Sequence, residues 1–300
     1  MFAGQGAQAV GMGKALYDAY AVARETFRTA EEATGLPLRE LCFDGPAERL
    51  GATEVTQPAL LTVDVAAWRS LVHELGAPPV AAAAGLSLGE YAALVAAEAV
   101  DFAVAVRLVR ERGRLMQEAV PQGEGGMLAL IGLGRAAVED LCRQAGDEVA
   151  PANYNCPGQV VVSGRLAALE RVRAAALAAG ARRAVFLDVS APFHMALLAP
   201  ARKALLPLLE AVDWRPPAFP VVANLTARAY AGPAEIPSVL ARQVDHAVDW
   251  EGCVAAMRGL GAEEFLELGP GRALSGFVRR IVPGASVRSV AEPDDIVVRS

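Results

Sequence analysis

The chain has 300 residues, of which 54% are hydrophobic and 21% are charged, and its formal net charge is −6. A chain of this length can bury a sizeable core, and charged residues interrupt every apolar run before the roughly 18 residues that a membrane-spanning helix needs. The negative balance and the lack of a basic run argue against nucleic acid as a partner. The N-terminal residues lack the basic start and long apolar stretch of a signal peptide, so we expect a cytoplasmic protein.

The four cysteines and three histidines form no disulfide or metal-ligand pattern. The cysteines lie far apart in the sequence without a C-x-x-C pair, and no histidine lies at ligand spacing from one of them. We therefore expect reduced thiols and no structural metal.

Helical patterns alternate with short apolar runs at both ends of the chain. Before residue 118 we predict helices over 13–34, 58–75 and 88–98, with an apolar run at 79–85. After residue 191 we predict helices over 195–211, 237–243, 250–260 and 272–282, with strands at 219–225 and 263–269. Strands separated by helices indicate a mostly parallel sheet that is covered on both faces.

The middle of the chain has a different order, strand–helix–strand–strand–helix–strand. These elements are predicted at 126–133, 135–146, 148–155, 158–164, 166–180 and 182–190. This order is that of a ferredoxin-like unit. We therefore predict an α/β fold in which an α/β-hydrolase-like core of residues 1–118 and 191–300 carries an inserted ferredoxin-like subdomain at 119–190. A cleft between the two parts is a natural ligand site.

One serine lies between two glycines, in the segment GLSLG at residues 85–89. This segment fits G-x-S-x-G, the sharp strand-to-helix turn that exposes a nucleophilic serine at a helix N-terminus. The N–H of Leu88 would then point at the oxyanion. The pentapeptide is short enough to arise by chance, so a structural role for Ser87 is the alternative.

An activated serine needs a base, and histidine is the usual one. His194 is favoured because it follows a strand and precedes a helix, whereas His73 lies inside a helix and His246 in a polar segment. No aspartate between the serine and His194 lies at an obvious strand end, which weakens a plain Ser-Asp-His hydrolase.

Arg112 falls on the apolar stripe of the helical pattern over 101–120, next to Gly113. A buried arginine is costly unless it meets a carboxylate. That carboxylate belongs either to a small diacid substrate, which a guanidinium binds bidentately, or to a glutamate of the protein. The residues alone leave both open.

Several stretches together resemble one family, the malonyl-CoA:acyl carrier protein transacylases and the acyltransferase domains of polyketide synthases. They occur in family order from residue 2 to about 282, which is nearly the whole chain. The stretches are FAGQGAQAVGMG, TQPALL, GLSLGEYAALVAA, RGRLMQEAV, ANYNCPGQVVVSG, SAPFH and FLELGPGRALSGFVRRI.

The resemblance implies that Ser87 is the acylated nucleophile and His194 its base. The backbone N–H groups of Gln5 and Leu88 would form the oxyanion hole. The family commonly has histidine before the serine, where this chain has Leu86. Because the implied base lies elsewhere, Leu86 should leave the implied mechanism intact. It puts in doubt the polarity of the pocket and the rate of the reaction.

The resemblance also assigns roles to three further residues. Arg112 would hold the free carboxylate of a malonyl group, and the backbone carbonyl of Gln243 would orient the histidine in place of an aspartate. Phe193 would exclude acyl groups with an α-methyl branch. Family members usually carry a strand before the GQG loop, whereas this sequence starts at Met1, which would loosen the placement of Gln5.

The implied reaction moves a malonyl group from malonyl-CoA to the phosphopantetheine thiol of acyl carrier protein, with no cofactor, in a monomeric enzyme of fatty-acid or polyketide biosynthesis. Two alternatives are a serine hydrolase such as a thioesterase and a non-catalytic relative that docks the carrier protein. The absent triad acid and Arg112 count against the first, whereas Leu86 keeps the second open.

Overall fold

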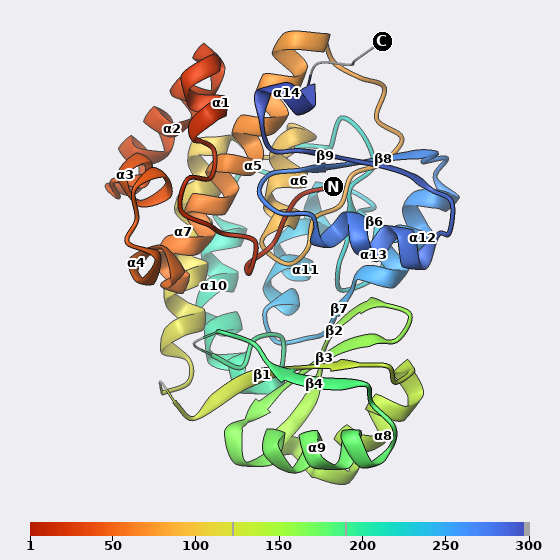
Figure 1. Cartoon of the computed structure of the whole chain (residues 1–300). Helices are drawn as coiled ribbons and strands as arrows, with labels where there is room; N and C mark the ends of the chain where they lie inside the picture. The colour runs from red at the N-terminus through yellow and green to blue at the C-terminus, as the bar shows by residue number, and fades with distance from the viewer. Residues whose placement is uncertain (122, 190, 297–300) are drawn as a thin grey trace.

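The computed structural model describes residues 1–121, 123–189 and 191–296. Seven helices are described before residue 120: α1 (Lys14–Ala19), α2 (Ala21–Thr34), α3 (Leu38–Phe43), α4 (Ala47–Gly51), α5 (Thr53–Leu75), α6 (Gly89–Ala96) and α7 (Phe102–Glu118). The helix predicted over 13–34 is two helices, because Tyr20 between them has extended backbone. The helix predicted to open at Pro58 starts at Thr53 and contains the proline. Helices α2, α5 and α7 pack together on one side of the molecule (Figure 1).

The middle of the chain forms four antiparallel strands of a five-stranded sheet, together with two helices. Its elements are β1 (Gly125–Ile131), α8 (Arg135–Ala145), β2 (Val149–Cys156), β3 (Gln159–Arg165), α9 (Leu166–Ala178) and β4 (Arg183–Phe186). The strand order is β4-β1-β3-β2, and α8 and α9 cover one face around their own apolar cluster. This unit lies at one end of the molecule (Figure 1) and has the predicted strand and helix order.

The chain then returns to the larger part of the fold. The remaining elements are α10 (Ala199–Glu210), β5 (Val222–Ala223), β6 (Arg228–Ala229), α11 (Ile236–Gln243), β7 (Val248–Asp249), α12 (Trp250–Gly259), β8 (Glu264–Leu268), α13 (Ala273–Ile281), β9 (Ser286–Val290) and α14 (Pro293–Ile296). Single 3₁₀ turns lie at Gly146–Glu148, Ala196–Leu198 and Pro233–Glu235. Strand β7 pairs in parallel with β2 and so joins the two parts. The sequence interpretation missed β9.

The parallel sheet of the larger part is held mainly by single bridges. Strands β8 and β9 form a regular parallel ladder, but Phe2 pairs with Gly85 and Leu268 only at single positions, and Ala83 pairs with Val221 in the same way. The predicted strand at 219–225 is therefore reduced to β5. The arrangement still brings the chain start and the segment before α6 side by side. None of the described helices is long and apolar enough to cross a membrane.

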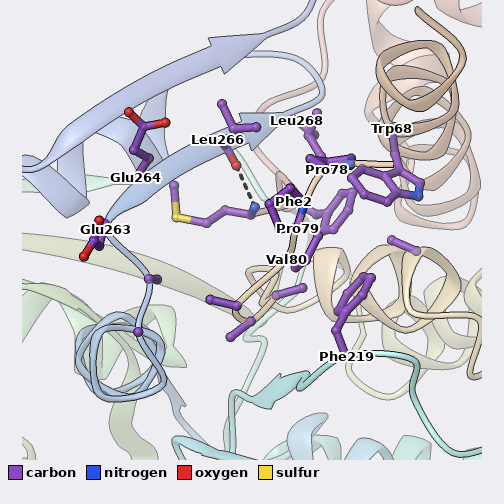
Figure 2. Close-up of a pocket in the computed structure, with 17 residues that line it drawn as sticks. Phe2, Trp68, Pro78, Pro79, Val80, Phe219, Glu263, Glu264, Leu266 and Leu268 are labelled. Carbon is purple, nitrogen blue, oxygen red and sulfur yellow. Dashed lines mark hydrogen bonds between the residues drawn. The ribbon is translucent and has the colours of Figure 1, made fainter. Parts of the chain in front are cut away.

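A mostly apolar cavity of about 620 Å³ surrounds the chain start. The Met1 ammonium donates to the Leu266 carbonyl at 2.6 Å. Trp68 and Phe219 lie on the cavity wall (Figure 2). Burial lowers the pKa of this ammonium to about 6. Neither Ser87 nor His194 lines this cavity, so it is separate from the site described next.

Candidate active site

Ser87 occupies a strained turn directly before α6. Its φ is +53°, in the left-handed region that non-glycine residues rarely adopt. A Cβ on Gly85 would clash with the Gly89 carbonyl, and a Cβ on Gly89 would clash with the Phe2 carbonyl oxygen. The two glycines therefore allow the tight turn and its contact with the chain start. The turn has the backbone geometry expected of a nucleophile elbow.

Asn224, which follows β5, holds this turn in place with two hydrogen bonds. The Ser87 N–H donates to Asn224 Oδ1 at 2.6 Å, and Asn224 Nδ2 donates to the Gly85 carbonyl at 2.8 Å. The sequence interpretation did not single out this residue. Because it lies 137 positions from the serine, only the folded chain reveals the contact.

His194 lies against the serine oxygen, with its Nε2 2.8 Å from Ser87 Oγ. Its Nδ1 lies 2.8 Å from the backbone carbonyl oxygen of Gln243. A carbonyl can only accept, so Nδ1 carries the proton and Nε2 is free to accept from the serine hydroxyl. Burial, assisted by the positive charge of Arg112, lowers the pKa of His194 to about 4. The imidazole is therefore neutral at pH 7, as a general base must be.

The other two histidines lie elsewhere. His246 Nδ1 bonds to Asp245 and to the Arg242 carbonyl, and its side chain is exposed. His73 in α5 lies edge-on to the ring of Tyr20. Neither contacts Ser87, so His194 is the histidine that the fold brings to the serine.

Arg112 on α7 is 1% exposed and lies against the same serine. Its Nη2 donates to Ser87 Oγ at 3.0 Å and to Gln243 Oε1 at 2.8 Å, and its Nη1 donates to Gln57 Oε1 at 2.8 Å. Its Nε has no hydrogen-bond partner among the described residues. A Cβ on Gly113 would lie 2.6 Å from the Thr53 carbonyl oxygen, so the glycine permits α7 to approach α5.

The alternative of an internal salt bridge for Arg112 is not what the structure shows. Within the described ranges no carboxylate forms an ion pair with it, and the oxygens to which it donates are neutral. Burial lowers the pKa of Arg112.

Glu90 on α6 connects the groups around the serine. Its Oε2 accepts from the Asn224 N–H at 2.9 Å and from Gln243 Nε2 at 2.7 Å, and its Oε1 accepts from the Tyr230 hydroxyl. Gln243 Nε2 also donates to the Ser87 carbonyl at 3.0 Å. The sequence interpretation missed Glu90, which lies on the mostly apolar helix predicted at 88–98.

A cavity of about 450 Å³ opens onto Ser87 and His194. Gln5, Leu86 and Phe193 also line it, together with residues of β1, β2 and β3, so it lies between the two parts of the fold. The remaining predicted residue, Leu88, is buried at the N-terminus of α6. Described His, Cys, Asp and Glu residues form no group that could hold a metal ion.

Residues 4–6 lie directly against the turn, since a Cβ on Gly4 would clash with the Leu86 carbonyl oxygen. The Gln5 side chain donates to Thr53 Oγ1 at 3.3 Å. The chain start is fixed by backbone bonds on both sides, from the Phe2 N–H to the Ala84 carbonyl at 3.0 Å and from the Leu268 N–H to the Met1 carbonyl at 2.8 Å. These bonds fix the chain directly before the loop of Gln5.

Serine, histidine and arginine meet at the start of α6 as in an enzyme that passes an acyl group through a serine, and the chain is an acyltransferase. It belongs to the acyl transferase domain family, whose model matches residues 1–297. It is 45% identical to the malonyl CoA-acyl carrier protein transacylases of Salmonella typhimurium and of Escherichia coli K12, over 98% of this chain and 95% of each relative.

Solved structures agree with this assignment. An acyl carrier protein S-malonyltransferase from Vibrio cholerae is 44% identical with a TM-score of 0.94, covering 98% of this chain and 97% of that one. A malonyl-transacylase solved in complex with a type II PKS acyl carrier protein is 42% identical with a TM-score of 0.95, covering 98% and 96%. The predicted α/β fold is confirmed by this similarity.

Proposed function

We propose that this chain transfers a malonyl group from malonyl-CoA to the phosphopantetheine thiol of an acyl carrier protein. The observation that carries the proposal is the position of Ser87 Oγ, which lies 2.8 Å from His194 Nε2 and 3.0 Å from Arg112 Nη2. A nucleophile thus lies between a neutral base and a cation that can hold a second carboxylate. The names of the relatives at 45% identity support the same substrate and acceptor.

In the first half-reaction, Ser87 Oγ attacks the thioester carbonyl carbon while His194 Nε2 takes the hydroxyl proton. The negative charge on the carbonyl oxygen is stabilised by the backbone N–H groups of Gln5 and Leu88. Collapse of this intermediate breaks the C–S bond, and His194 returns the proton to the CoA sulfur. The carrier-protein thiol then attacks the malonyl-serine ester by the reverse steps, which restores the serine hydroxyl.

The remaining residues of the site position the substrate and the base. Arg112 binds the malonyl carboxylate, and the Gln243 carbonyl keeps His194 in the tautomer that accepts at Nε2. Phe193, which lines the cavity beside His194, limits branching at the α-carbon. Leu86 replaces the family's usual histidine without a step being lost, since no proton transfer in this mechanism uses that position.

The division of the chain follows the same proposal. Residues 1–118 and 191–300 form a discontinuous acyltransferase core, and residues 119–190 form the inserted ferredoxin-like subdomain. One apolar cluster whose buried members all lie between residues 128 and 181 supports this division. We further propose a cytoplasmic monomer that needs no cofactor.

Intact-protein mass spectrometry after mixing with malonyl-CoA tests the function. We expect a stable malonyl adduct on the wild type, no adduct on Ser87→Ala, and transfer to carrier protein when it is added. Rapid release of malonate without an adduct would instead support a hydrolase, and no reaction would support a non-catalytic, carrier-docking relative.

The role of Arg112 is tested by comparing two acyl donors. Arg112→Ala is expected to lose malonyl loading while acetyl loading is kept or rises, because only malonyl has a free carboxylate. Arg114→Ala is the matched control, since Arg114 lies on the same helix but is exposed and paired with Glu111 and Glu118. Equal loss of both donors in Arg112→Ala would show that the arginine is structural.

A further inference from the structure

One amide group separates two buried charges next to the serine. The Gln243 side chain accepts from Arg112 Nη2 through Oε1, at 2.8 Å, and donates to Glu90 Oε2 through Nε2, at 2.7 Å. Glu90 is 0% exposed and Arg112 is 1% exposed, and the two do not touch. The order carboxylate–amide–guanidinium is therefore a fixed feature of the core.

A buried guanidinium needs a compensating charge, because removal from water penalises its charged form. Glu90 supplies such a charge: its carboxylate acts on Arg112 through space, in the direction that favours the charged guanidinium. A direct ion pair between Glu90 and Arg112 would also favour the charged guanidinium. A glutamate carboxylate bound in this bidentate way would, however, occupy the N–H groups that a substrate carboxylate requires. With Glu90 at a distance, Arg112 Nε has no hydrogen-bond partner among the described residues and is available to a substrate carboxylate.

We propose that Glu90 is a positioning residue that serves as a detached counter-ion for Arg112, with Gln243 as the spacer between them. The inference rests on the proposed function. It explains how a buried arginine stays charged although no carboxylate of the described residues binds its N–H groups. The same carboxylate also helps to position the serine through Asn224. Glu90 accepts from the Asn224 N–H, and Asn224 Oδ1 accepts from the Ser87 N–H.

The arrangement has a consequence for the acyl-enzyme. With Glu90 ionised, its charge and that of Arg112 cancel in the free enzyme, whereas arrival of the malonyl carboxylate adds one negative charge to the buried group. Glu90 thus limits how strongly Arg112 holds the malonyl group, which favours its onward transfer from Ser87. A variant without this charge should hold malonyl more tightly and release it more slowly.

Glu90→Gln removes the charge and can keep the hydrogen bonds. The glutamine oxygen can accept from the Asn224 N–H and Gln243 Nε2, and its amide N–H can donate to the Tyr230 oxygen. With malonyl-CoA we expect KM to fall by about threefold or more and transfer from malonyl-serine to carrier protein to slow by a similar factor. With acetyl-CoA we expect KM and the rate of transfer to carrier protein to stay within about twofold of their wild-type values.

The control is the same substitution in Arg112→Ala, where Glu90→Gln should no longer change the ratio of malonyl to acetyl loading. Equal changes for both acyl groups in the single variant, or a higher KM for malonyl-CoA, would overturn the counter-ion role. A wild type that loads no malonyl overturns the proposed function itself, and with it this inference. The two failures are therefore distinguishable.

A second variant covers the case in which Glu90→Gln does not fold. Gln243→Met removes the spacer, so we expect Glu90 and Arg112 to pair directly and the ratio of malonyl to acetyl loading to fall at least about threefold. A ratio that stays at the wild-type value in Gln243→Met would overturn the proposal.

Discussion

Two of the buried carboxylates of this protein, Asp64 on α5 and Glu90 on α6, lie on apolar helices, and their surroundings are opposite. Glu90 accepts hydrogen bonds from Tyr230, Asn224 and Gln243. Neither carboxylate oxygen of Asp64 has a hydrogen-bond partner among the described residues. Burial raises the pKa of both groups, but at Glu90 the three donors and Arg112 act in the other direction.

Glu90 is hydrogen-bonded to residues around Ser87, whereas Asp64 is buried away from the candidate active site. At Asp64 the Met1 ammonium favours the charged form, whereas Glu267 disfavours it. Gly269, at φ +100°, leaves room for this carboxylate, since a Cβ there would clash with Asp64 Oδ1. Burial alone therefore says little about function. The donors that surround the carboxylate carry the information.

The largest effect is expected from Glu90→Leu. This change leaves the Asn224 N–H, the Gln243 amide and the Tyr230 hydroxyl without their acceptor and Arg112 without its counter-ion. We expect the free energy of unfolding to fall by about 3–5 kcal/mol, the range for breaking a buried charged network. Urea denaturation at pH 7.5 measures it. A loss below about 1 kcal/mol would show that the network contributes little to folding.

Asp64→Asn should act in the opposite direction. Because the pKa of Asp64 is raised in the folded state, the folded protein binds more protons than the unfolded chain above the ordinary value of 3.8, and stability falls as pH rises through this range. Asparagine does not titrate. We therefore expect a gain of about 1–3 kcal/mol at pH 7.5 that disappears near pH 4.

Thermal unfolding of Asp64→Asn and the wild type at both pH values measures this difference. A gain of the same size at pH 4 and pH 7.5 would mean that the carboxylate charge is not its cause. A loss of stability at pH 7.5 would mean that Asp64 has donors, which would remove the contrast with Glu90.

The sequence predicts Ser87, His194 and Arg112 because each stands in a local pattern. The serine lies in a five-residue turn motif, the histidine follows a strand, and the arginine falls on an apolar stripe. The structure places the three side chains in contact.

Glu90 could not be identified in the same way. An acid inside an apolar helix is visible in the sequence, but Asp64 in LLTVDVAAW shows the same pattern. The donors that distinguish Glu90 come from residues 134 to 153 positions away, so no window of sequence contains them. The sequence also does not indicate that single bridges hold much of the parallel sheet, because an apolar run shows that a strand is present but not how many backbone bonds it makes.

The smallest effect comes from a matched pair of tyrosines. Tyr230→Phe removes a hydroxyl that donates to Glu90, and because bonds to charged groups are among the stronger ones we expect a loss of about 1–2 kcal/mol. Tyr91 lies next to Glu90 in sequence and is fully buried, but its hydroxyl has no partner among the residues that the structure describes. Tyr91→Phe should therefore change stability by about 0.5 kcal/mol or less, or increase it. Urea denaturation of both variants under one set of conditions measures the difference. Equal losses would mean that both changes act through packing and that the hydroxyl contributes nothing to holding Glu90.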